Sequence, residues 1–455
     1  MLGQLCRLRD TKIAKSAATA RKHCGSGFLA GFRRASPRSA PLALLPSESD
    51  HLPAGHTDAQ YSTSRWAQPI VSGQGAVDSP GDPAGLVVTK AGLQGLIDIL
   101  KAEGYTILGP RVAEGAIVVD EIQQLSDLPA GWSDEQDGGY YRLRRSGNGA
   151  LFGFAATAQG WKRHLYPPGE RVWAVRRRGE SFVPEDREPI SGQYALFGVR
   201  ACDLAGVAVL DRVLGSAGAN DANFQERRRA AFVVAVDCAR PAGTCFCTSM
   251  ATGPAAKEGF DLALTELIDD NDHEFLVRAG SERGEAVLAH LHGRGSGQHD
   301  RAAARRQGAD AARRIGREMP PDAAGLLRRN LKHGRWEETA GRCLTCGNCT
   351  SVCPTCFCTD VGESTALDGT FAERTRVSDS CFTIAFSFLH GGSIRQSAAA
   401  RYRQWITHKL SFWHEQFGMS GCVGCGRCIT WCPVGIDITE EVRAVRDSEP
   451  KRSPW

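Results

Sequence analysis

Apolar residues first become periodic near residue 90, after a long stretch without a pattern. Leu93, Leu96, Ile97 and Leu100 recur at the spacing of one helix face, and Gly104 supplies a stop. This predicts a helix over residues 90–103. Short apolar runs separated by turn residues follow, and they predict strands in a mostly antiparallel region: residues 116–119, 140–143, 150–154 and 172–175.

The pattern changes at Tyr194, where the apolar runs become continuous. Residues 195–199 and 232–236 each predict a strand buried on both faces, and Val207, Leu210 and Leu214 mark a helix between them. Asp203 is suited to cap that helix. The order strand, helix, strand predicts a βαβ unit with parallel strands.

The second half of the chain has a different character. Residues 280–334 are charged and interrupted by glycine, which predicts a helical connector. Residues 381–389 and 397–416 are expected to be helical, with His390-Gly391-Gly392 between them.

Residues 1–83 are rich in Ala, Ser, Arg, Gly and Pro and show no sustained apolar period. We expect this segment to be disordered. Its early basic residues resemble those of an organelle transit peptide, but a misplaced start codon gives the same composition, and we favour that interpretation.

Length and charge restrict the function. A chain of 455 residues with 42% hydrophobic residues holds two or three domains, and a net charge of +4 gives no case for nucleic acid or an anionic membrane. No apolar stretch is long enough to span a bilayer. The 17 cysteines are odd in number and clustered, which indicates reduced thiols and a cytoplasmic location; organelle targeting is the alternative if the extension is genuine.

Two cysteine runs near the C-terminus repeat one spacing, C-x-x-C-x-x-C-x-x-x-C-P. This is the pattern of two-cluster ferredoxins, in which the fourth cysteine of each run reaches the other cluster. It predicts two [4Fe–4S] ligand sets: Cys343, Cys346, Cys349 with Cys432, and Cys422, Cys425, Cys428 with Cys353. Structural zinc is the alternative, but zinc needs only four ligands and no second copy of this spacing.

A second group of cysteines surrounds the predicted βαβ unit. Cys202 and Cys238 follow neighbouring parallel strands, and Cys245 and Cys247 lie on the loop that leaves the second strand. Because such strand ends share one edge of a sheet, we expect these four thiols to converge on a third [4Fe–4S] cluster. Small buried cysteines are the plainer alternative.

Cys356, Cys358 and Cys381 remain unassigned between ligands, shielding residues and core. Neither a dinucleotide fingerprint nor a phosphate loop occurs in the sequence, so flavin and nucleotide have no evident site.

The predicted architecture is therefore an α+β N-terminal domain containing a βαβ unit, followed by a helix-expanded dicluster ferredoxin domain. The expected boundaries are residues 84–280 for the cluster-binding α/β domain, 281–334 for the connector, 335–447 for the ferredoxin domain and 448–455 for a tail.

Four segments carry a resemblance to a known family: residues 198–204, 244–254, 353–358 and 421–428. From about Leu86 to Asp447 the chain resembles the iron–sulfur β subunit of cytoplasmic sulfhydrogenases, which are NiFe hydrogenases linked to NAD(P), and the A subunit of anaerobic sulfite reductase. The long N-terminal extension and the connector, rich in arginine and alanine, depart from the family.

The resemblance implies a subunit that carries only [4Fe–4S] clusters and performs no bond chemistry. Its implied partners are a flavoprotein subunit that binds FAD and reacts with NAD(P)H, and a NiFe hydrogenase or sirohaem sulfite reductase catalytic subunit. A redox-sensing binding module is the alternative from another class. A radical or hydratase-type iron–sulfur enzyme is disfavoured, because it needs an open iron and the cysteine sets here are complete.

A row of basic residues between the two cysteine runs is a candidate for steering an acidic partner, against the plainer interpretation of a solvated helix face. It comprises Arg395, Arg401, Arg403 and Lys409.

Overall fold

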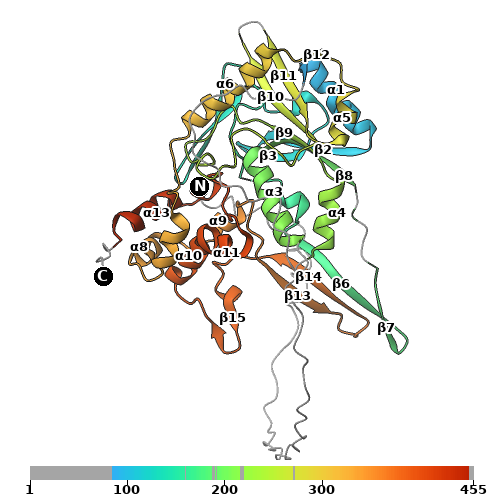
Figure 1. Cartoon of the computed structure of the whole chain (residues 1–455). Coiled ribbons are helices and arrows are strands. Elements are labelled where there is room, and N and C mark those ends of the chain that lie inside the picture. The colour runs from blue at the N-terminus through green and yellow to red at the C-terminus, as the bar shows by residue number, and fades with distance from the viewer. Residues whose placement is uncertain are drawn as a thin grey trace, which may run out of the picture. The chain divides into compact units, whose positions relative to one another are not determined.

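The computed structural model describes residues 85–158, 160–186, 190, 192–215, 220–269 and 272–449 (Figure 1). The predicted extension over residues 1–83 and most of the predicted tail lie outside the described residues.

An eight-stranded mixed sheet, in the order β12-β1-β11-β10-β9-β8-β2-β3, dominates the first half of the described chain. Strands β10, β9, β8 and β2 run parallel to one another, and the pairs on either side of them are antiparallel. The strands are β1 (Leu86–Thr89), β2 (Tyr105–Ala113), β3 (Ala116–Glu121), β8 (Gln193–Arg200), β9 (Phe232–Val236), β10 (Leu262–Ile268), β11 (His273–Ala279) and β12 (Arg294–Gly295).

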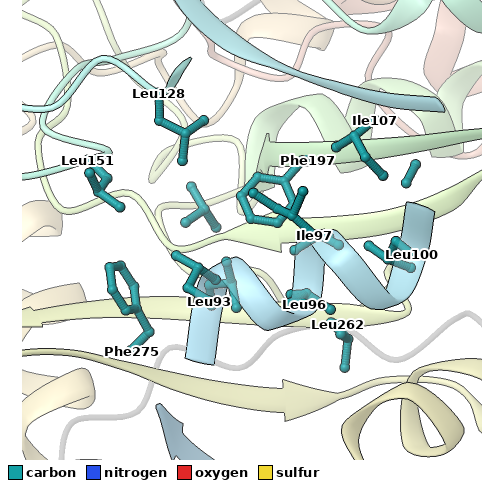
Figure 2. Close-up of a cluster of buried hydrophobic side chains, with 14 of the residues drawn as sticks. Leu93, Leu96, Ile97, Leu100, Ile107, Leu128, Leu151, Phe197, Leu262 and Phe275 are labelled. Carbon is teal, nitrogen blue, oxygen red and sulfur yellow. The ribbon is translucent and has the colours of Figure 1, made fainter. Parts of the chain in front are cut away.

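Helices cover both faces of this sheet. Helix α1 (Lys90–Ala102) places Leu93, Leu96 and Ile97 against Phe197 and Phe275 in one core (Figure 2). Helices α3 (Ala201–Leu214) and α4 (Ala222–Ala230) pack on the other face. Because β8 and β9 are buried on both faces, their sequences are continuously apolar rather than alternating.

The helix predicted over residues 90–103 is confirmed, and the Thr89 hydroxyl accepts a hydrogen bond from the Gly92 N–H at its start. The predicted βαβ unit corresponds to β8, α3 with α4, and β9. The capping role expected for Asp203 is wrong. Arg200 precedes the first turn, and Asp203 lies inside the helix, where its carboxylate binds Arg427.

A second sheet contains four strands in the order β13-β14-β6-β7. Its strands are β6 (Gly169–Arg178), β7 (Ser181–Pro184), β13 (Thr359–Thr365) and β14 (Phe371–Ser378). Strands β6 and β7 precede the domain boundary predicted at residue 280, and β13 and β14 follow the boundary predicted at residue 334. Both boundaries stay predictions. Arg376 of β14 forms ion pairs with Glu170 and Asp221, so the junction is held by buried charge as well as by the ladder.

The segment after residue 280 is largely helical. Its helices are α5 (Glu282–Leu288), α6 (Gln298–Arg314), α7 (Ala323–Arg329), α8 (Arg335–Arg342), α9 (Asn348–Ser351), α10 (Ala398–Thr407), α11 (Trp413–Phe417), α12 (Arg427–Thr430) and α13 (Ile438–Asp447), with a π-helical turn over His408–Phe412. Leu326, Leu327, Trp336, Tyr402 and Val442 form a core that α7, α8, α10 and α13 share.

The remaining elements are small. They are the pair β4 (Trp132–Asp137) with β5 (Tyr140–Arg145), the pair β15 (Phe388–Leu389) with β16 (Gly392–Ser393), helix α2 (Lys162–Leu165) and the 3₁₀ turns Leu125–Asp127 and Ile384–Ser387.

The strand predicted over residues 150–154 is wrong. Side chains replace a neighbouring strand there: Glu266 accepts hydrogen bonds from the N–H groups of Leu151 and Phe152, at 2.6 and 3.0 Å. Arg200 donates to the carbonyl oxygens of Phe152 and Phe154. With its backbone groups satisfied in this way, the segment stays irregular.

Two further expectations need correction. Residues 381–389 form turns and strand β15 instead of a helix. The connector is helical over α5, α6 and α7, but Arg294–Gly295 form β12, which pairs with β1 at the edge of the large sheet. Within the part of the chain that the structure describes, no helix has the length and apolarity needed to cross a membrane.

Candidate metal centres

The first-run thiols share one cavity with a cysteine of the second run. Cys343, Cys346, Cys349 and Cys432 line it together, against Tyr402, Trp405 and other largely apolar groups. The Thr345 N–H donates to the Cys343 sulfur at 3.4 Å. Cys346 is the exposed member, whereas burial raises the pKa of the Cys349 thiol well above its usual value. This is the grouping that the ferredoxin pattern predicts.

Cys353 lies among the second-run thiols. It interacts electrostatically with Cys422, Cys425 and Cys428, and burial raises the pKa of Cys422 to about 12. The Gly424 N–H donates to the Cys422 sulfur at 3.5 Å. The structure therefore brings the second predicted set together.

Two glycines allow the second-run loop to approach the N-terminal half of the chain. Gly424 and Gly426 have φ values of +64° and +73°. A Cβ on Gly424 would lie 2.6 Å from the Phe246 carbonyl oxygen, and one on Gly426 would collide with Thr244. The Phe246 N–H donates to the Gly424 carbonyl oxygen at 2.8 Å, so these positions require glycine for both φ and space.

The third predicted group also converges. Cys202 lies in the first turn of α3, directly after β8, and Cys238 lies two residues after β9. Both line one cavity with Cys245 and Cys247, and Cys425 of the second run lines it too. Burial raises the pKa of Cys202 and Cys245 well above the usual thiol value. The expected meeting at the carboxyl edge of the parallel strands is therefore present.

A buried ion pair lies between the second and third groups. Arg427 is 1% exposed and Asp203 is 3% exposed, and their side chains are 2.9 Å apart. Arg427 also donates to the Thr157 carbonyl oxygen at 2.5 Å. Its charge acts on Cys425 and Cys202, one from each group. No sequence pattern signals this pair, because its members are 224 positions apart.

The chemistry of the three groups fits cubane clusters better than single ions. Among the described residues, no three His, Cys, Asp or Glu side chains lie close enough to hold one metal ion. Four thiolates around one zinc must be close neighbours, whereas a cubane separates its ligand sulfurs by its own width. Buried thiols with raised pKa values also need a cationic group to become thiolates.

Two lysines lie beside Cys353: Lys162, which the sequence did not single out, and Lys409, which the sequence placed in the basic row. Lys162 donates to the carbonyl oxygens of Cys353 and Cys356, at 2.9 and 2.8 Å, and Lys409 donates to the Thr355 hydroxyl at 2.8 Å. Lys409 is 6% exposed and Arg401 is 8% exposed. The proposed basic row over residues 395–409 is therefore wrong as a solvent-facing surface.

Comparisons with known proteins agree with this architecture. The 4Fe-4S dicluster domain family matches residues 342–436. The sulfhydrogenase 2 subunit beta of Pyrococcus furiosus is 32% identical over 304 residues, which cover 63% of this chain and 85% of that protein. No solved structure matches the chain at the same level of significance. The chain belongs to the family of sulfhydrogenase β subunits and contains a 4Fe-4S dicluster domain.

Proposed function

We propose that this chain is the electron-relay subunit of a soluble oxidoreductase complex, passing electrons between an NAD(P)H-reactive flavoprotein subunit and a NiFe hydrogenase catalytic subunit. One observation carries the proposal. The second-run loop contributes Cys428 to the lining of the first-run cavity and Cys425 to the lining of the third. A central set between two others is the arrangement that a relay requires.

The ligands of this relay would be the three sets already described, each with four cysteines. Bound there, [4Fe–4S] clusters supply one-electron carriers whose potentials respond to burial and to hydrogen bonds at sulfur. The chain contributes apolar walls and N–H donors such as those of Thr345 and Gly424. Arg427 contributes a positive charge between two of the sets.

The first-run set and the third set, which lie on either side of the second, differ in their exposure to solvent. Cys346 is exposed, and Leu344 next to it is 60% exposed. Cys202, Cys245 and Cys247 are buried. The first-run set is therefore the one that a partner subunit reaches most directly.

A relay in an anaerobic sulfite reductase is the second candidate, since the same cysteine runs occur in the A subunit that this chain resembles. A redox-sensing module is a third. The subunit that copurifies with the chain separates these three functions. A nickel-containing subunit supports the hydrogenase relay, and a sirohaem subunit supports the sulfite reductase relay. The absence of both subunits supports the redox-sensing module.

The decisive experiment adds a purified flavoprotein subunit of the same complex to the anaerobically purified chain. Because the chain has no nucleotide fingerprint, it should bind no flavin and oxidise no NAD(P)H by itself. Its visible absorption should bleach only when the flavoprotein and NADH or NADPH are both present. Stoichiometric flavin in the chain alone, or NAD(P)H oxidation without a partner, would contradict the proposal.

A further inference from the structure

Cys358 and Cys381 meet at the base of the β13–β14 hairpin, outside the three ligand sets. The ladder of this hairpin ends at the pair Thr359 and Ser378. One position further, the Asp379 N–H donates to the Cys358 carbonyl oxygen at 2.9 Å. This bond holds Cys358 against the segment that leads to Cys381.

The turn that carries Cys381 is itself anchored. The hydroxyl groups of Ser380 and Thr350 are 2.8 Å apart, which ties the turn to the first cysteine run. The Phe382 N–H donates to the Ser380 hydroxyl at 3.1 Å, and the Thr383 N–H donates to the Ser380 carbonyl oxygen at 2.8 Å. The side chains of Cys358 and Cys381 are hydrogen-bonded to each other. Two thiols in contact on two anchored segments are placed to bond to each other.

The three unassigned cysteines do not form one group. Cys356 is hydrogen-bonded to Cys353, a member of the second set, and not to the Cys358 and Cys381 pair. Cys358 and Cys381 are thus a separate dithiol.

We propose that Cys358 and Cys381 form a thiol–disulfide exchange site that takes small-molecule disulfides. The Cys358 thiolate attacks one sulfur of the disulfide RSSR, forming a mixed disulfide and releasing RS⁻. Cys381 then loses its proton to water and attacks the Cys358 sulfur, which closes the protein disulfide and releases the second RS⁻. Two protein thiols are oxidised and one small disulfide is reduced to two thiols. Excess small thiol reverses both steps.

The surroundings favour Cys358 as the attacking sulfur. The hydrogen bond from Cys381 and the positive charge of Lys409 lower the pKa of Cys358 to about 7, whereas that of Cys381 is raised. Both residues are partly exposed, so a small disulfide can reach them. Thiolate character and access are the two conditions that exchange requires.

The test uses the iron-loaded chain, purified anaerobically and incubated with oxidised glutathione. After acid quenching and alkylation, peptide mass spectrometry should find Cys358 linked to Cys381 in most molecules, with two thiols lost per chain and the iron content unchanged. Reduced glutathione in excess should restore both thiols.

Two variants make the result specific. Cys381→Ser should leave a glutathione adduct on Cys358, because the resolving thiol is gone. Cys356→Ser, the matched control, should still form the link. Loss of iron in Cys358→Ser or Cys381→Ser would show that these residues are ligands, and a link through Cys356 or no link at all would also overturn the proposal. Iron content reports on the proposed relay separately, so the two failures are distinguishable.

Discussion

Arg427 joins the two halves of the described chain through a buried charge. Its guanidinium is buried and bonded to Asp203, beside cysteines of two sets. Removing one member of a buried ion pair leaves the other charge uncompensated, which costs about 3–5 kcal/mol. Arg427→Met should therefore lower the free energy of unfolding by about that amount, measured by anaerobic denaturant titration.

The double variant Arg427→Met with Asp203→Asn provides the control. Because it removes both charges, it should recover a large part of the lost stability. Additive losses from the two single changes would show that the pair does not act as a unit. Loss of the cation should also shift the midpoint potentials of the neighbouring centres to lower values, an effect that structural damage alone does not predict.

His164 provides a prediction for pH. Burial, helped by the positive charge of Arg163, lowers the pKa of His164 to about 4. In the unfolded chain the imidazole takes its proton near pH 6.5, so between these values the unfolded state binds more protons. Stability should therefore fall as the pH falls from 7 to 5, by roughly 2 kcal/mol from this residue.

His164→Asn removes the titrating group, so its stability should change less between pH 7 and pH 5 than that of the natural sequence. The measurement is the difference between the two proteins in urea titrations at both pH values. Parallel pH profiles would show that His164 titrates in the folded state as it does in the unfolded chain.

Single residues were predictable from sequence where spacing carries the chemistry. The two cysteine runs can be recognised in the sequence because a [4Fe–4S] cluster requires the spacing C-x-x-C-x-x-C-x-x-x-C-P. Cys202 and Cys238 required an inference about strand order, and the structure brings them to one cavity. Lys162 carried no signal and Lys409 was assigned to a solvent-facing row, because a buried lysine is recognisable only from the partners that surround it.

At the level of elements, continuous apolar runs identified β8 and β9, and helical spacing identified α1. The hairpin β13–β14 was missed because β13 is almost entirely exposed and shows no apolar alternation. Pairing with β6 and the ion pairs of Arg376 stabilise it. Such long-range terms also override the strand propensity of residues 150–154, whose N–H groups bind Glu266.

The two cysteine runs predict cross-ligation, in which the fourth cysteine of each run binds the cluster of the other run. Cys432 lines the cavity of Cys343, Cys346 and Cys349, whereas Cys353 lies among the second-run thiols. Cys432→Ala should therefore disturb the centre held by the first run and leave that of Cys422 and Cys425 intact. Electron paramagnetic resonance of the reduced variants, compared with Cys343→Ala and Cys422→Ala, checks the assignment. A Cys432→Ala spectrum that matches Cys422→Ala instead would refute the cross-ligation.

For the whole molecule, the proposed sets are built from distant parts of the chain. Cys202 and Cys425, which line one cavity, are separated by most of the described sequence, and the glycines at 424 and 426 permit the close approach. The cysteine spacings supplied the proposed members of the first two sets, and strand order supplied those of the third. Neither pattern could predict that the second-run loop lies between the first-run set and the third set. That position depends on how the large sheet and the C-terminal helices pack.

The metal content of the anaerobically purified chain tests the central claim most directly. Three sets of four cysteines predict about twelve irons and about twelve acid-labile sulfides per chain, with broad visible absorption that bleaches on reduction. About eight irons would remove the third set and leave a two-cluster ferredoxin. Stoichiometric zinc without visible absorption would contradict the account as a whole.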